Sequence, residues 1–241
     1  MLHYSQEYID DVSVRFAYHS NGIEGNNLTR GQTQAIMLEN IITTIGFHSI
    51  KLQDIYEAAN QKSAFDLLLS LAMNDAPLSI DTILQLQFEL TKNTIATTGK
   101  FKQNENYIVG ADFSTASVYE TPFLVQQWVE NTNFQLNNAK SNDEILKVLI
   151  DSHIKFERIH PFDDGNGRTG RELINLELAK HEMPFLVIEK EDKPQYVTFE
   201  QESDVAGLFE YAKEKLEQEA KRYKTFEENY QKQKDFESKN K

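Results

Sequence analysis

The chain has 241 residues, of which 39% are hydrophobic and 11% aromatic, values typical of a globular protein with a sizeable core. Its 38 acidic and 25 basic residues give a formal net charge of −13, which argues against binding to nucleic acids or to anionic membranes. Cysteine is absent, so disulfides and thiolate metal sites are excluded. Because the sequence contains neither a secretory-signal pattern nor an apolar run long enough to cross a bilayer, we expect a cytoplasmic protein.

The N-terminal part begins with an amphipathic helix, since apolar residues recur at helical spacing across residues 4–19. The stretch that follows, residues 20–27, contains two glycines and is a poor helix by propensity. Ser20 and Glu24 are four residues apart, so they would share a face if one further turn formed. Gly25 is then a natural terminator for that turn.

Helical patterns continue through most of the chain. Residues 29–73 are predicted to be helical, and Thr29 and Gln32 fit a capping box at the start of this region. Ser79 is predicted to cap a further helix, and another is expected to begin near Thr121. The sequence therefore predicts a mainly α-helical domain.

Residues 99–113 differ from the rest of the chain. Two short β-prone runs flank Asn104, Glu105 and Asn106, so we expect a small β-hairpin here. An exposed hairpin edge can bind an extended peptide of another protein. The alternative is a structural hairpin that binds nothing.

The most informative stretch runs from His160 to Arg171. A helical pattern over residues 143–159 leads into it, and Pro161 ends that helix because the residue before a proline avoids the α region. The run 165–167, Gly-Asn-Gly, allows a sharp turn with positive φ, and a second helical pattern follows. The free N–H groups of this loop and the positive end of the second helix form an anion site.

Charged groups around this loop indicate what the site does to an anion. Arg168 and Arg171 lie on the first turn of the second helix, where guanidinium groups can bind phosphate oxygens bidentately. Asp164 can hold a magnesium ion shared with phosphate oxygens. His160, with an ordinary pKa near 6.5, can accept a proton from a hydroxyl nucleophile. Together these groups predict phosphate transfer from a nucleotide.

These residues match the motif of the Fic (filamentation induced by cAMP) family, His-x-Phe-x-Asp/Glu-Gly-Asn-Gly-Arg-x-x-Arg, over residues 160–171. The resemblance implies a Fic-type helical bundle that transfers AMP from Mg-ATP to a hydroxyl side chain of a target protein. His160 would be the base and Asp164 the metal ligand. Gly165, Asn166, Gly167, Arg168 and Arg171 would bind the ATP phosphates, and Phe162 would pack into the core.

Residues 20–26 resemble a second Fic signature, the inhibitory motif Ser/Thr-x-x-x-Glu-Gly/Asn. The resemblance implies that Ser20 and Glu24 form an N-terminal inhibitory helix, with Glu24 on Arg171 where the ATP γ-phosphate should bind. In some relatives the same glutamate positions a water that removes AMP, so de-AMPylation is a second expected activity. The alternative is that Glu24 is a solvated turn residue.

In Fic proteins the segment that corresponds to residues 99–113 is a flap that pairs with the target backbone. We therefore expect Lys102, Tyr107, Ile108 and Val109 to form a target-binding flap. Lys102 or Tyr107 could also contact the nucleotide.

The resemblance places a Fic domain at residues 1–212 and leaves residues 213–241 as a charged helical tail. The expected partners are ATP and a target protein docked on the flap, without nucleic acid or membrane, and a homo-oligomer is also possible. Three alternatives stay open: use of another nucleotide, transfer of another phosphate-containing group such as phosphocholine, and a nucleotide-binding regulator without turnover. A nuclease is disfavoured by the net charge.

Overall fold

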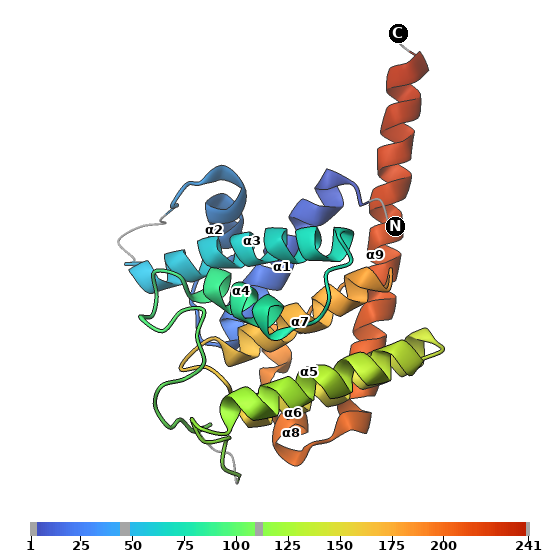
Figure 1. The fold of residues 1–241 in the computed structure, drawn as a ribbon. Coiled ribbons are helices and arrows are strands. Elements are labelled where there is room, and N and C mark those ends of the chain that lie inside the picture. The colour runs from blue at the N-terminus through green and yellow to red at the C-terminus, as the bar shows by residue number, and fades with distance from the viewer. Residues whose placement is uncertain (1–3, 44–48, 109–112, 240–241) are drawn as a thin grey trace.

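The computed structural model describes residues 4–43, 49–108 and 113–239, and within these ranges the secondary structure is helical, with no β-strand. Figure 1 shows a bundle of helices with one long helix at its side. The helices of these ranges are α1 (Gln6–Ile23), α2 (Arg30–Gln34), the π-helix η1 (Ala35–Glu39), α3 (Leu52–Met73), α4 (Ile80–Thr91), α5 (Thr121–Asn138), α6 (Asn142–Ile159), α7 (Asn166–Lys180), the 3-10 helix η2 (Lys190–Asp192), α8 (Lys193–Glu202) and α9 (Val205–Lys239).

Helix α7 lies in the middle of the bundle because it is apolar on more than one face. Leu173 and Leu176 belong to a first core cluster, whereas Ile174 and Leu178 belong to a second. A helix that is apolar all round is stable only when other helices surround it. α3 and α4 pack on one side of α7 and α6 packs on the other, backed by α5 (Figure 1). The helix that carries the second half of the Fic-like motif is therefore held by other helices on both sides.

The predicted helix caps are confirmed. Thr29 accepts a bond from the Gln32 N–H at 3.2 Å, and the Thr29 N–H donates to the Gln32 side chain at 2.9 Å, which completes the capping box. The Ser79 hydroxyl accepts from the N–H of Thr82 at 3.1 Å. These bonds satisfy N–H groups that have no partner within their own helix.

The stretch predicted as a poor helix continues α1 for one more turn and ends it sharply. Gly25 has φ +98°, its N–H bonds to the carbonyl of Gly22, and the Asn26 N–H bonds to the carbonyl of Asn21. This pair of bonds is a Schellman motif, so the predicted role of Gly25 as terminator is confirmed. A glycine is needed at position 22 inside the helix, because the Lys190 side chain occupies the space that a Cβ would need.

The hairpin predicted for residues 99–113 is wrong, because the described part of that segment contains no strand. Its polar groups bond to the motif loop instead of to a facing strand. The Lys102 N–H donates to the Pro161 carbonyl at 2.8 Å, and Asn106 Nδ2 donates to the Phe162 carbonyl at 2.8 Å. These long-range bonds outweigh the local β-propensity of the segment.

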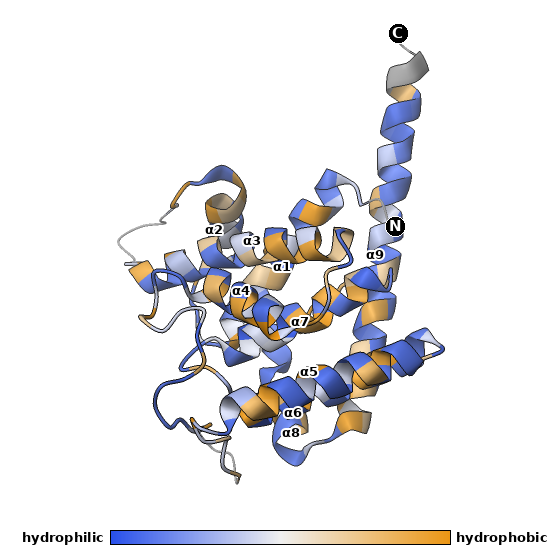
Figure 2. Cartoon of the chain, in the orientation of Figure 1, coloured by the Kyte–Doolittle hydropathy of each residue, from blue (hydrophilic) through white to orange (hydrophobic). Residues whose placement is uncertain are grey.

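Helix α9 runs without a break across residue 213 and docks along the body for about its first half. Leu208, Ala212 and Leu216 are buried in the second core cluster, and Tyr223 and Phe226 pack against the first. Beyond these residues the helix extends past the body and is mostly hydrophilic (Figures 1 and 2). Among the described residues, no helix is both long and apolar enough to cross a membrane.

Candidate active site

The motif loop connects α6 to α7 through two residues with positive φ. α6 ends at His160, which has φ +50° and whose N–H bonds to the Phe156 carbonyl at 3.0 Å. Gly165 has φ +84° and precedes the first residue of α7, Asn166. The Asn166 side chain closes the loop, since its Oδ1 accepts from the Phe162 N–H and its Nδ2 donates to the Phe162 carbonyl, both at 2.8 Å. The Asn166 side chain therefore fixes the conformation of the loop.

Phe162 anchors the loop in the core, as the family resemblance implied. Its side chain is fully buried between Phe101 and Phe156, with ring centroids at 6.0 and 6.3 Å. The buried Phe162 ring therefore ties the middle of the loop to the hydrophobic core.

Beside the loop lies a cavity of about 400 Å³, large enough for a nucleotide. It is lined by the motif residues His160, Asp163, Asp164, Gly165, Asn166, Gly167 and Arg171, by Ile23 and Glu24 at the end of α1, by Glu157 and Arg158 of α6, by Ile108 and Phe113, and by Lys193, Tyr196, Val197, Glu200 and Gln201 of α8. Five separate segments thus meet at this cavity.

His160 is held in a form that can accept a proton. Its Nδ1 lies 3.3 Å from the carbonyl oxygen of Glu157, and a carbonyl can only accept, so we assign the hydrogen to Nδ1 and the free lone pair to Nε2. Burial lowers the pKa of His160 below its ordinary value of 6.5, although the bond to the Glu157 carbonyl opposes this shift. The imidazole is therefore neutral at pH 7.

Arg171 is bound by the two residues that the inhibitory-like signature contains. Its Nη2 donates to Glu24 Oε1 at 2.6 Å and to the Ser20 carbonyl at 3.1 Å, and its Nε donates to the Ser20 hydroxyl at 3.0 Å. Gly167 makes this approach possible, because a Cβ there would lie 2.5 Å from Glu24 Oε1 and 2.8 Å from Arg171 Nη1.

The electrostatics of this pair follow from burial and mutual attraction. The Arg171 side chain is 3% exposed and that of Glu24 is 38% exposed. Burial alone would raise the pKa of Glu24, but the attraction of Arg171 outweighs it and the pKa is lowered. Burial likewise opposes the charge on Arg171, and Glu24 more than compensates, so the pKa of Arg171 is raised. Both groups are charged near neutral pH.

Asp164 lies at the cavity with its side chain 41% exposed, whereas Arg168 does not line the cavity and is 3% exposed. Arg168 Nη2 donates to both Asp164 oxygens, at 3.1 and 3.2 Å, and its Nη1 lies 3.6 Å from Glu57 Oε1. The donor chemistry of Asp164 fits magnesium, because a carboxylate at the cavity edge is a hard oxygen ligand with lone pairs to spare. Arg168 orients that carboxylate and does not point at the nucleotide position.

The residues of the expected flap lie in different environments. Lys102 is 2% exposed, and its Nζ bonds to Asn106 Oδ1 at 2.8 Å and to the Ile159 carbonyl at 3.5 Å. Tyr107 is 80% exposed, Ile108 lines the cavity, and Val109 lies outside the described residues. Lys102 therefore bonds to the end of α6 and to the motif loop, through the carbonyls of Ile159 and Pro161.

Sequence reasoning missed several residues that line the cavity. Glu157 lies three residues before His160 on α6, so the i, i+3 spacing could have placed it beside the base. Tyr196 and Glu200 lie one turn apart on α8, a helix with Pro194 near its start that we did not predict. Burial, with Glu200 next to it, raises the pKa of Glu157 well above its usual range, and Arg171 opposes this shift.

Comparisons with known proteins show which family this chain is similar to. A sequence model of the Fic/DOC family matches residues 77–178. The protein adenylyltransferase fic-1 of Caenorhabditis briggsae is 29% identical over 184 residues, which cover 75% of this chain and 34% of that protein. The protein adenylyltransferase Fic of Drosophila mojavensis is 27% identical over 184 residues, covering 76% of this chain and 35% of that protein.

The solved structures include a Fic domain containing signaling protein from Bacteroides thetaiotaomicron. Its TM-score is 0.79 and its identity 26%, with 88% of this chain and 85% of that chain covered. This chain is therefore similar to Fic proteins, in sequence over residues 77–178 and in its fold, and the predicted mainly helical fold is confirmed apart from the hairpin. It spans about a third of the length of the curated relatives it matches.

Proposed function

We propose that this protein is a protein adenylyltransferase, which transfers AMP from Mg-ATP to a hydroxyl group of a target protein. One observation carries the proposal: His160, the Gly165–Gly167 loop and Arg171 line a single cavity of about 400 Å³. The relatives named protein adenylyltransferases support it, at 27 to 29% identity.

The chemistry expected of His160 follows from its tautomer. The target hydroxyl oxygen forms a bond to the α-phosphorus of ATP while the bond from that phosphorus to pyrophosphate breaks. The hydroxyl proton passes to His160 Nε2, and pyrophosphate leaves with the electrons of the broken bond. Because the bond to the Glu157 carbonyl fixes the imidazole, little reorganisation is needed during this step.

The phosphates would be bound by the loop backbone and the start of α7. The N–H groups of Gly165, Asn166 and Gly167 lie at the positive end of that helix. Asp164 would hold Mg²⁺, which when bound neutralises part of the phosphate charge. Arg171 would bind the γ-phosphate, and Arg168 would act through Asp164.

We further propose that Glu24 inhibits this activity in the same chain. A carboxylate oxygen resembles a phosphate oxygen, and the Glu24 carboxylate occupies Arg171 at 2.6 Å. ATP would then bind without its γ-phosphate contact, with its α-phosphate out of line with His160. Under this proposal the protein would belong to the class with an N-terminal inhibitory helix, here α1.

Target binding would use the exposed part of the flap segment, residues 99–113. Tyr107 is exposed and Ile108 faces the cavity, so both are available to an extended target chain, with Val109 as the next residue. Docking by backbone pairing remains our proposal for this segment. Cytoplasmic location, self-association and the division near residue 213 likewise remain predictions.

A pair of labelling reactions tests the function. Glu24→Gly protein is incubated with cell lysate and Mg²⁺, once with α-labelled and once with γ-labelled ATP. Protein labelled only from the α position supports AMP transfer. Label only from the γ position would make the protein a kinase, and no label despite ATP binding would favour another nucleotide or a regulator without turnover.

De-AMPylation needs its own test, because Glu24 would have to position a water for it. AMP-modified target is incubated with wild-type protein and metal. Loss of label with wild type, and retention with Glu24→Gly, supports the second activity; retention with both removes it.

A further inference from the structure

Helices α6 and α8 face each other, and each carries two polar side chains that lie one turn apart. His153 and Glu157 lie on α6, and Tyr196 and Glu200 lie on α8. His153 Nε2 is 2.6 Å from the Tyr196 hydroxyl and 3.2 Å from Glu200 Oε1. One ligand atom from each of His153, Glu157 and Glu200 lies within 4.8 Å of the other two. None of these four residues belongs to the motif that defines the active site.

Two atoms of this cluster are buried without a hydrogen-bond partner. Glu157 is 8% exposed and its Oε1 has no partner, and His153 is 2% exposed and its Nδ1 has none. Both atoms face Gly170, where a Cβ would lie 3.0 Å from the first and 2.7 Å from the second. A buried carboxylate oxygen that lacks a partner is unfavourable unless a proton or a cation compensates it.

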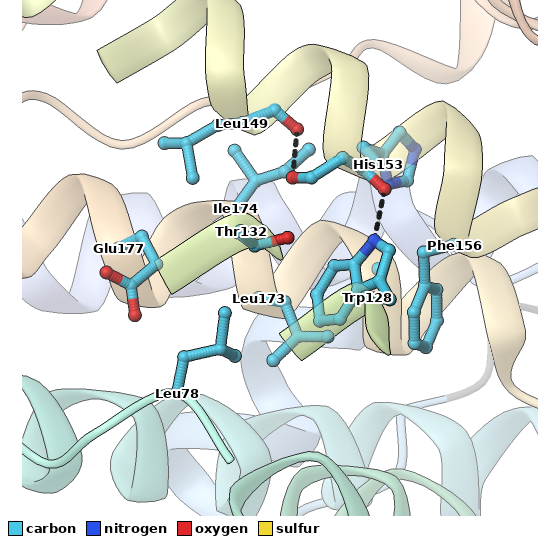
Figure 3. A pocket seen from close by; sticks show the side chains of 11 residues that line it. Leu78, Trp128, Thr132, Leu149, His153, Phe156, Leu173, Ile174 and Glu177 are labelled. Carbon is cyan, nitrogen blue, oxygen red and sulfur yellow. Dashed lines mark hydrogen bonds between the residues drawn. The ribbon is translucent and has the colours of Figure 1, made fainter. Parts of the chain in front are cut away.

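The small internal cavity beside His153 is not lined by Glu157, so it offers that carboxyl group no partner. Figure 3 shows His153 at its edge, near Trp128 and Phe156, and its volume is about 10 Å³. That is room for about one water molecule at most. Glu157 and Glu200, in contrast, both line the large cavity, through which an ion could reach them.

We propose that His153, Glu157 and Glu200 form a binding site for a first-row divalent cation of the zinc type. One imidazole and two carboxylates suit Zn²⁺ better than Mg²⁺, because imidazole is a borderline-soft nitrogen ligand. Zinc ligand atoms lie about 2.0–2.2 Å from the metal and hence about 3.3 Å from each other. Glu200 Oε1 already lies 3.2 Å from His153 Nε2, so the Glu157 side chain is the one that needs to move closer, which side-chain rotation allows.

The cluster offers nitrogen and oxygen donors to a cation. One imidazole and two carboxyl groups meet there, and the guanidinium of Arg171 is already paired with Glu24 at 2.6 Å. The bound cation would join α6 to α8 beside His160. The site is separate from Asp164, which lies near the end of the motif loop, two residues before α7, and would hold the magnesium of the substrate.

Metal titration without nucleotide tests the proposal independently of transfer activity. Co²⁺, a spectroscopic substitute for Zn²⁺, is added to metal-free protein, and Zn²⁺ is then used to displace it. We expect one ion per chain, visible absorption bands of a low-coordinate site, and binding at least tenfold weaker in Glu200→Gln. Glu157→Gln should weaken it similarly, and circular dichroism confirms that both variants fold.

Asp164→Asn is the matched control, because it removes the other candidate metal ligand. Its Co²⁺ and Zn²⁺ affinity should equal that of the wild type. The proposal is overturned if the wild type binds neither ion, if Glu200→Gln binds as tightly as the wild type, or if Asp164→Asn loses the site.

Discussion

Replacement of Glu24 by glycine is the sharpest test of the proposed inhibition. The change removes the hydrogen-bonded ion pair to Arg171, with its 2.6 Å distance, and leaves the bonds from Arg171 to Ser20. A hydrogen bond between charged groups contributes about 1.5–3 kcal/mol. Because the Glu24 side chain is 38% exposed, solvent screening favours the lower part of that range, about 1.5–2 kcal/mol.

Since each 1.4 kcal/mol is about a tenfold change in an equilibrium, the population with Arg171 free should rise about 10- to 30-fold. The initial rate of target labelling from α-labelled ATP should rise by the same factor. Glu24→Gln is the matched control, because it keeps an acceptor for Arg171 without the charge, and its rate should be intermediate. Equal labelling rates in Glu24→Gly and wild type, with both proteins folded and binding ATP, would refute the inhibitory role.

Four further predictions concern the base, the pH response, the support of α1 and the loop. His160→Ala should abolish labelling while ATP affinity changes less than about threefold, because only proton removal is lost; labelling that survives would mean another base. With the Glu24→Gly protein, labelling should be constant from pH 7 to 8 and fall below pH 6.5, since burial lowers the pKa of His160 and only the neutral form accepts a proton; a fall that begins above pH 7 would contradict this. Glu219→Ala removes the α9 residue that pairs with Arg15 of α1 at 2.7 Å. Because this pair is nearly buried, the free energy of unfolding should fall by about 3 kcal/mol, measured by calorimetry, and α1 should be held less firmly. Labelling should therefore rise when Glu24 is present but not in the Glu24→Gly protein. Gly165→Ala should destabilise the protein by about 1–2 kcal/mol in chemical unfolding, because φ is +84°; unchanged stability would show that the loop relaxes.

Much of the site could be predicted because its residues are close in sequence. The distance between His160 and Arg171 is set by one loop, and residue types alone indicated a turn, an anion site and a base. The four-residue spacing of Ser20 and Glu24 predicted a shared face, and both residues do lie on Arg171. Local spacing was enough in these cases because a helix turn fixes which side chains lie together.

The failures have a different physical origin. Local β-propensity indicated a hairpin around residue 105, but long-range bonds from Lys102 and Asn106 to the motif loop decide the conformation. The same bonds bury Lys102, a residue that sequence reasoning places on the surface. Tyr196 and Glu200 reach the cavity only through the packing of α8 against α6, and no spacing in the sequence records a contact of that kind.

The most direct measurement compares the binding of ATP and AMP to wild-type and Glu24→Gly protein by calorimetry. If the Glu24 carboxylate occupies the γ-phosphate position on Arg171, its removal should tighten ATP binding by about 10- to 30-fold, as for one charged hydrogen bond. The affinity for AMP, which has no γ-phosphate, should be unchanged. Equal gains for both nucleotides, or no gain for ATP, would contradict the account.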